Sequence, residues 1–262
     1  IDDIFDDVRP APSWSGSDPA AGAAEIADRM AADELFLPTH PAPTHWLADA
    51  APSAPWLLAP SPAALAQTTG PAPDAAASLP VSVPAVLPLS APIEKLHAFG
   101  RRHGWSLWLR GPLGKRRAVG HWNELAAARD ALIEQTGTPD ALVLQRRREG
   151  TPHAVAFAAD GGTVLDAALI RPTSSQQAFG EATALPPHWQ SALRDALQAL
   201  DWTGGGRLTL IEDADGTRWL DAWRPCFGVE VAGLAQCGVN LPAQLLAARS
   251  GATVASPDAP AS

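Results

Sequence analysis

The sequence predicts an α+β protein, and three features indicate this class. Two pairs of apolar runs flank turn signals at Asp160-Gly161-Gly162 and at 213–216, and each pair is typical of an antiparallel β-hairpin. Between them, apolar residues at helical spacing over 186–200 predict a helix that packs on a sheet. Near the N-terminus, two short apolar runs at 35–38 and 56–59 enclose a helical stretch, and this β-α-β order predicts a small parallel sheet.

The other elements follow from local signals. Asp18-Pro19 supplies an N-cap and a first-turn proline for a helix through 20–32. Residues 1–17 are acidic and then proline-containing, which is typical of solvated surface. Residues 71–91 are rich in proline and alanine with little periodicity, so we interpret them as a domain connection. The remaining expected elements are a helix at 42–50, a helix at 92–103, two strands across 105–119, a helix at 121–135, strands at 140–147, 153–159 and 163–171, a polar loop at 172–185, a hairpin from 208 to 222, and a helix at 241–248.

Composition narrows the functional classes. The formal net charge of -9 argues against general nucleic-acid binding, which normally needs a basic surface. No run approaches the ~18 apolar residues of a membrane span and no signal peptide is recognisable, so we expect a cytoplasmic protein without a membrane partner. Cys226 and Cys237 lack metal-ligand spacing and are expected as free thiols. Scarce lysine beside abundant arginine and alanine is typical of a GC-rich bacterial genome.

Two segments resemble a known family. The segment GWSLWLRGPLGKRRAVG at 104–120, and the C-terminal hairpin followed by Pro225, Phe227 and Gly-Val-Asn-Leu-Pro at 238–242, resemble the ATP-grasp superfamily of carboxylate–amine ligases and the large chain of carbamoyl-phosphate synthase. The resemblance covers roughly 35–250 and rests mainly on the order of the elements. The domain organisation it implies is a truncated α/β pre-ATP-grasp domain at 1–70 whose opening strand would precede Ile1, the connection at 71–91, a two-lobed ATP-grasp domain at 92–250 and a disordered tail at 251–262.

The resemblance also implies a nucleotide site for ATP. Arg110 stands where the family has a lysine that contacts the α-phosphate, and an arginine keeps the charge with a planar fork of donors. The glycine-rich loop that follows covers phosphates in the family, and the strand at 140–147 matches the one whose backbone binds adenine. The candidate nucleotide-binding residues are Arg110, Gly111, Gly114, Lys115, Leu144, Gln145 and Glu149. An exposed hairpin turn with solvated cations is the alternative interpretation of the loop.

The magnesium ligands of the family are substituted. On the alignment set by the turn at 213–216, the metal carboxylates and their neighbouring asparagine fall on Thr209, Ala222 and Arg224. Magnesium held against phosphates normally needs one or two carboxylates. We therefore predict no metal site, with Asp221, Asp213 and Glu212 as the alternative ligands. Strand alternation predicts that Asp221 faces the opposite side of the sheet from Ala222, unless a β-bulge re-aims it.

Three functions remain open, and no catalytic residue is assigned. The first is a degenerate ATP-grasp protein, without or with weak ligase activity, that acts as a regulatory partner of an active ligase or another biosynthetic protein. The second is an active ATP- and magnesium-dependent carboxylate–amine ligase whose acids have moved. The third is a module that binds an anion through Arg110, Lys115, Arg116 and Arg117. The acceptor substrate stays unassigned, and a homo-oligomer stays open.

Overall fold

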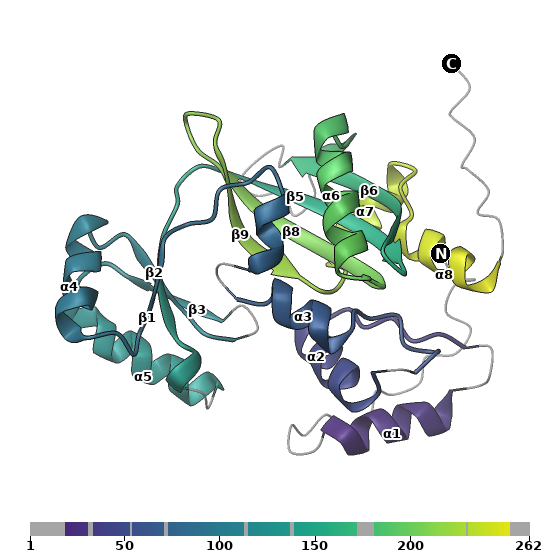
Figure 1. Ribbon diagram of the computed structural model, residues 1–262, viewed down its shortest axis with the longest axis horizontal. Coiled ribbons are helices and arrows are strands. Elements are labelled where there is room, and N and C mark those ends of the chain that lie inside the picture. The colour runs from purple at the N-terminus through teal and green to yellow at the C-terminus, as the bar shows by residue number, and fades with distance from the viewer. Residues whose placement is uncertain are drawn as a thin grey trace.

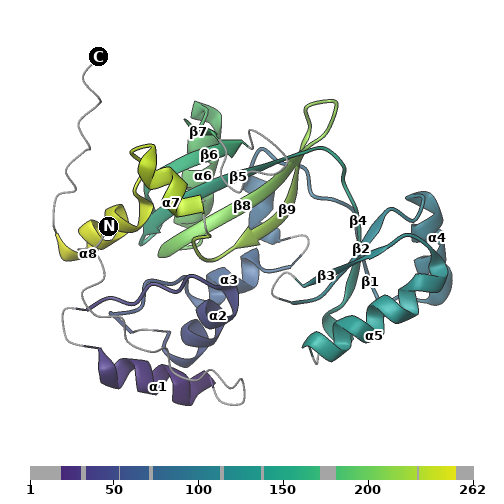
Figure 2. The same cartoon turned by 180° about the vertical axis from the view of Figure 1, so that it is seen from behind.

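Two antiparallel sheets with helices packed on them form most of the structure (Figure 1). The computed structural model describes residues 19–30, 34–52, 54–70, 73–112, 115–136, 139–171, 181–228 and 230–251. The four-stranded sheet and its helices form a small lobe, the five-stranded sheet and its helices form a large lobe, and a helical unit lies at the N-terminal side (Figure 1, Figure 2). This mixture of helices and antiparallel sheets confirms the predicted α+β class.

The N-terminal unit consists of three short helices. They are α1 (Pro19–Arg29), α2 (Pro41–Ala50) and α3 (Pro62–Thr68). The side chain of Ser61 accepts a hydrogen bond from the Ala64 N–H at 3.2 Å, and Pro62 occupies the first turn, so α3 begins with both preferred signals. The two runs predicted as strands meet only at a parallel bridge between Phe36 and Leu57. Prolines lack the N–H that would extend this ladder, and one follows the first run at Pro38.

The described part of the segment 71–91 packs on both lobes. It contains the 3-10 helix η2 (Asp74–Ser78) and the strand β1 (Val86–Pro88). Leu79 is buried in the core of the large lobe, Ser82 bridges Trp219 at the edge of the large sheet, and β1 is an edge strand of the small sheet. Its apolar residues are spaced irregularly because they face two different sheets.

The small lobe has the strand order β1-β4-β2-β3. Leu107 and Leu109 of β2 are buried against the helices, so Trp108 and Arg110 point to the opposite face by strand alternation. That opposite face is turned toward the large lobe. The elements are α4 (Ile93–Arg102), β2 (Leu107–Arg110), β3 (Arg116–Val119), η4 (Trp122–Glu124), α5 (Leu125–Thr136), η5 (Pro139–Ala141) and β4 (Val143–Arg146).

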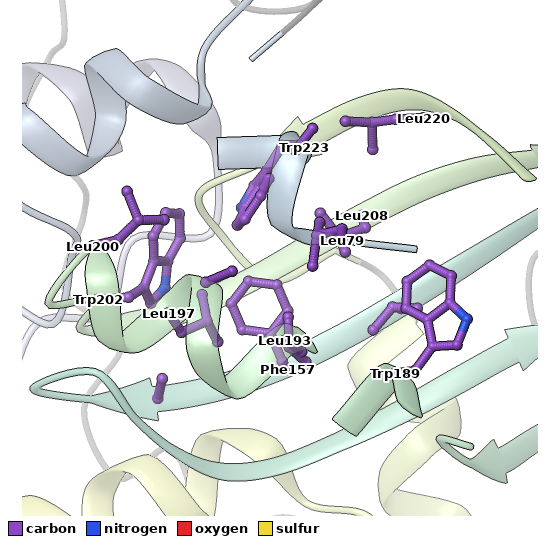
Figure 3. Close-up of a cluster of buried hydrophobic side chains, with 14 of the residues drawn as sticks. Leu79, Phe157, Trp189, Leu193, Leu197, Leu200, Trp202, Leu208, Leu220 and Trp223 are labelled. Atoms are coloured by element: carbon purple, nitrogen blue, oxygen red, sulfur yellow. The ribbon is translucent and has the colours of Figure 1, made fainter. Parts of the chain in front are cut away.

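The large lobe has the strand order β7-β6-β5-β8-β9, with helices on both faces. Helix α6 covers one face, where Phe157 packs edge-on against Trp202 and Trp223 at ring-centroid distances of 5.7 and 6.3 Å (Figure 3). Helices α7 and α8 lie over the other face (Figure 2). The elements are β5 (Thr151–Asp160), β6 (Thr163–Arg171), β7 (Glu181–Ala184), α6 (Pro187–Ala199), β8 (Gly204–Glu212), β9 (Arg218–Arg224), α7 (Glu230–Gln236) and α8 (Leu241–Ser250).

Two glycines let aromatic rings lie directly on the backbone of β8. A Cβ on Gly206 would stand 2.1 Å from Cζ of Phe157, and one on Gly205 would stand 2.6 Å from Cε1 of Phe227. The two rings lie on opposite faces of the sheet, as strand alternation requires. The glycine run at 204–206 therefore has a packing role in the middle of the sheet.

Two elements of the large lobe were not predicted. Strand β7 falls in the segment expected as a polar loop, because its residues Glu-Ala-Thr-Ala show no apolar alternation and it is an edge strand. Helix α7 was missed because it has only seven residues.

Among the described residues no single helix is long and apolar enough to cross a membrane. Only α7 and α8 taken together meet the criteria of length and composition, and they are bent by 84° relative to each other.

Candidate functional site

The β8–β9 hairpin contains a β-bulge at the edge of the cleft between the lobes. Leu208 lies opposite Trp223 and Thr209 opposite Ala222, but Leu210 then lies opposite Leu220. Asp221 is therefore the extra residue on β9. Thr209 and Ala222, onto which the sequence alignment placed the family's metal carboxylates, are direct cross-strand neighbours.

The bulge changes the direction of Asp221. Leu220 and Trp223 are both buried in the core on the α6 side, although they are three residues apart. Asp221 contacts arginines of the small lobe, and Ala222 lines a cavity together with one of those arginines. Asp221 and Ala222 thus face the same side, which is the effect of a β-bulge that the sequence analysis named as the exception to strict alternation.

Asp221 joins the two lobes through two ion pairs. Arg110 of β2 donates to Oδ1 of Asp221, and Nη1 of Arg116 of β3 donates to Oδ2 at 2.8 Å and to Oδ1 at 3.1 Å. The side chains of Arg110 and Asp221 are only 7% and 16% exposed, whereas that of Arg116 is 41% exposed. We call these three residues the Arg-Asp-Arg bridge. One carboxylate faces two guanidinium groups, so the bridge has a net positive charge.

Arg110 is the most constrained member of the bridge. Burial lowers the pKa of Arg110, the charge of Asp221 opposes this effect, and Arg116 and Arg224 add to the lowering. An arginine remains charged at physiological pH even so. Its Nε is buried and has no hydrogen-bond partner within the described part of the chain. A buried donor without a partner is costly, so this atom would gain from an additional acceptor.

A cavity of about 60 Å³ lies beside the bridge, where the N-terminal unit meets both lobes. Burial lowers the pKa of His45, with Asp49 opposing it, so this ring is neutral near pH 7. The charged side chains among the lining residues are then Arg110 and Arg224, and the cavity favours an anion. Its lining residues are Pro41, His45, Thr69, Gly70, Arg110, Gly111, Pro112, Ala222, Trp223, Arg224 and Pro225.

The glycine-rich loop after Arg110, which the resemblance predicts to cover phosphates, is described in part. Gly111 lines the cavity, and its N–H donates to the carbonyl of Lys115 at 2.9 Å, which closes the turn. Gly114 lies outside the described residues, and Lys115 is exposed. Of the predicted loop residues, the structure therefore brings Arg110 and Gly111 to the cavity.

The strand expected to bind adenine is an inner strand of the small sheet. Leu144 pairs with both β1 and β2, and its side chain is buried in the core away from the cleft. Gln145 is buried opposite Trp108, and Glu149 is exposed in the link between the lobes. The N–H groups of Arg146 and Arg147 already donate to Ala85 and Ser106.

A stack of cations and an aromatic ring lies on the cleft face of the small sheet. The guanidinium carbons of Arg116 and Arg147 lie 4.5 and 5.1 Å from the ring centroid of Trp108. Cation–π contacts of this kind orient both arginines. The stack therefore positions Arg116 for its contact with Asp221.

The other two acids considered as metal ligands lie elsewhere and have structural partners. Asp213 accepts hydrogen bonds from the N–H groups of Asp215 and Thr217 and from Nε1 of Trp219, and the last of these is the main cause of its lowered pKa. Glu212 accepts from Nε of Arg218 at 2.7 Å, which lowers the pKa of Glu212. Both acids stabilise the hairpin.

Magnesium does not fit the residues at this site. Asp221, the acid in the cleft, is engaged by two arginines, and Arg224 adds a further cation beside the cavity. No group of three His, Cys, Asp or Glu side chains that could hold a metal occurs in the described ranges. Magnesium in such sites is normally held by one or two free carboxylates together with waters, and guanidinium groups repel it.

The sequence interpretation missed the Arg-Asp-Arg bridge and the contribution of the N-terminal unit to the cavity. A signal for the bridge was present. Arg116 is the direct cross-strand partner of Arg110, so the two side chains lie on the same face of the hairpin. Like charges directly opposite each other on one face are destabilising, so this pair of arginines predicts an acidic partner beside it. His45 and Thr69 have no such signal, because they reach the cavity only through the packing of α2 and α3.

Comparison with solved structures identifies the fold. The biotin carboxylase–β,γ-ATP complex of Campylobacter jejuni is 16% identical with a TM-score of 0.66, and the match covers 90% of this chain and 57% of that one. The D-alanine–D-alanine ligase of Coxiella burnetii is 15% identical with a TM-score of 0.61, covering 83% of this chain and 68% of that one. The N5-carboxyaminoimidazole synthase of Aspergillus clavatus, in complex with ADP and 5-aminoimidazole ribonucleotide, is 15% identical with a TM-score of 0.59, covering 81% and 59%.

These similarities concern structure. No family model matches the sequence, and no curated protein matches it. The similar enzymes are ATP-grasp enzymes, so the chain has the ATP-grasp fold, as the two sequence segments predicted. The chain spans 57% of the length of the biotin carboxylase.

Proposed function

From the ATP-grasp fold and the geometry of its cleft, we propose that this protein binds a nucleotide or a related anion between its lobes without catalysing magnesium-dependent ligation. The observation that supports this most is the Arg-Asp-Arg bridge. It lies where the family resemblance expects a cation against phosphate and, on the facing hairpin, carboxylates for the metal. The arginines keep the cation that would contact phosphate, and they leave no free carboxylate to hold the metal.

The donors of the site suit phosphate oxygens. Arg110 offers an unpartnered Nε in a buried position, Arg116 offers a fork, and Arg224 lines the adjoining cavity. Arginine recognises phosphate through parallel N–H donors, and the interaction strengthens as water is excluded. Two of the similar enzymes were solved with an adenine nucleotide or its analogue, which makes ATP and ADP the first ligands to test.

The same residues argue against phosphoryl transfer. Catalysis in such a site would need a divalent ion to neutralise the charge that develops on the transferred group. With Thr209, Ala222 and Arg224 at the metal positions, the chain supplies no ligand set for that ion. A nucleotide that is bound and not consumed would serve as a signal, and we propose that its readout is an interaction with an active ligase or a related biosynthetic enzyme.

Calorimetric titration with ATP and with ADP, in the presence of a chelator and then of magnesium, tests this function. We expect binding in the chelator, no release of phosphate on addition of carboxylates and amines, and a loss of about 1.5–3 kcal/mol of binding free energy in Arg110→Ala. Arg101→Ala, on the exposed face of α4, is the matched control and should bind as the wild type does. Tight binding only with magnesium, together with phosphate release, would instead establish an active ligase and overturn the proposal.

A further inference from the structure

We infer that Asp221 competes with the ligand for Arg110 and Arg116. The ligand displaces the Asp221 carboxylate from these two arginines, and it binds as a polyphosphate without a metal ion. This inference rests on the proposed function and adds the form of the ligand and the way in which access to the site is regulated. It follows from the contacts, the burial and the charge of the Arg-Asp-Arg bridge.

The contacts of Asp221 are those that a phosphate group would make. Arg116 donates to both carboxylate oxygens, and Arg110 donates to one of them. A terminal phosphate presents the same pair of oxygens, at a similar spacing, and a third oxygen in addition. The Nε of Arg110, which has no partner in the described residues while Asp221 is bound, is the donor available for that third oxygen.

Burial makes some anion obligatory at this position. The Arg110 side chain is only 7% exposed, and a buried cation without a counter-charge is strongly destabilising. Asp221 supplies this counter-charge. A ligand can displace it only by bringing negative charge of its own, so neutral compounds and cations are excluded from the exchange.

The exchange also changes the contact between the lobes. Arg110 and Arg116 belong to the β2–β3 hairpin of the small lobe, and Asp221 belongs to β9 of the large lobe. The short Asp221 side chain reaches across only because the bulge points it toward the small lobe. When a free phosphate replaces the Asp221 carboxylate, the ion pairs of Arg110 and Arg116 no longer end on a residue of the large lobe, so the bound state has lost one direct link between the lobes.

The charge of the site selects the metal-free form of the ligand. When Asp221 leaves the two arginines, three guanidinium groups, including that of Arg224, remain around the ligand. A magnesium ion bound to a polyphosphate lowers the negative charge of the complex, and the three guanidinium groups repel the ion. Magnesium should therefore weaken binding, which is the reverse of the dependence in a magnesium-requiring enzyme.

The experiment compares the wild type with Asp221→Asn, which keeps the shape and removes the charge. Both proteins are titrated with ATP and with inorganic tripolyphosphate in a chelator, and then again with magnesium. We expect Asp221→Asn to bind both ligands ~10-fold more tightly than the wild type, since one charge-assisted competitor is removed. The factor should be the same for both ligands, because Asp221 competes with the phosphates and not with the base.

Asp215→Asn is the matched control. It makes the same change of charge in the same hairpin, at an exposed turn position away from the cleft, and should bind as the wild type does. Equal binding by the wild type and Asp221→Asn, or a gain confined to ATP, overturns the inference and leaves the proposed function standing. Binding by neither protein overturns both.

The magnesium titration of the wild type keeps the inference testable even where Asp221→Asn does not fold, which circular dichroism would reveal. Magnesium should weaken tripolyphosphate binding to the wild type several-fold. Binding that magnesium strengthens overturns the inference.

Discussion

Arg110 and Asp221 are 111 residues apart in the sequence, and their side chains form a buried ion pair between the two lobes. Arg110 stands on the strand that the family resemblance assigns to phosphate contact, and Asp221 stands on the hairpin assigned to the metal. While the two are paired, Arg110 is not free to contact a phosphate and Asp221 is not free to hold a metal ion. The pair links the two lobes directly, and under the proposed function it also occupies the site that an anion would take.

Removing one member of this pair should destabilise the protein. Asp221→Ala leaves the Arg110 guanidinium buried without its acid, and we expect the free energy of unfolding to fall by about 3 kcal/mol. Urea unfolding, with the slope of the transition unchanged, measures this loss. Adding Arg110→Met to the variant removes the unpaired charge and should recover part of the loss. A double variant less stable than Asp221→Ala would contradict the interpretation.

The close contact between Gly206 and Phe157 predicts a large effect of a single methyl group. Gly206→Ala would place Cβ at 2.1 Å from Cζ of Phe157, which is fully buried, and we expect a loss of about 2–3 kcal/mol in unfolding free energy. In Gly120→Ala, the Cβ would meet only the end of the Glu124 side chain at 3.3 Å, and stability should change by less than about 1 kcal/mol. Similar losses in the two variants would show that backbone freedom, and not packing, explains the glycine at 206.

His153 should make stability depend on pH. Burial lowers its pKa, Glu212 opposes this effect, and Arg218 and Arg171 act in the same direction as burial. The unfolded chain then binds a proton more readily than the folded one, so the unfolding free energy should fall as the pH drops from about 6.5 toward the lowered pKa, and then level off. This window lies above the range in which the lowered pKa values of Glu212 and Asp213 act.

His153→Gln isolates this contribution. The variant should lose less stability than the wild type over that pH interval, because its side chain does not titrate. His45 and His103, whose pKa values are also lowered by burial, are present in both proteins and cancel in the comparison. Parallel pH profiles for the two proteins, measured by urea unfolding, would count against a buried neutral ring at 153.

The two cysteines should react at very different rates. Cys226 is buried, and burial raises the pKa of its thiol to about 11, whereas Cys237 is exposed. The thiolate is the reactive form, so an aromatic disulfide reagent at about pH 8 should modify one thiol of the native protein quickly and the second only after unfolding. Cys237→Ser should remove the fast reaction. A fast reaction that persists in this variant would show that Cys226 is accessible.

The sequence by itself determined the fold and most of its elements. Hairpin turns such as Asp160-Gly161-Gly162 and the apolar spacing of α6 depend on local geometry and on one buried face, and both can be read from neighbouring residues. The prediction that Thr209, Ala222 and Arg224 stand at the family's metal positions also came from the sequence alone, and it stays a prediction. By contrast, β7 is a short edge strand that forms by pairing with β6, so its own residues do not predict a strand.

Only the tertiary structure decided what Asp221 does. Alternation along a regular strand would turn its side chain away from Ala222, and the bulge that reverses this direction arises because Leu220 and Trp223 must both enter the core beneath α6. Its partners come from another lobe, and the cavity beside it is completed by His45 and Thr69 of the N-terminal unit. Contacts between segments so distant in the chain are fixed by how sheets and helices pack, which no local pattern of residues encodes.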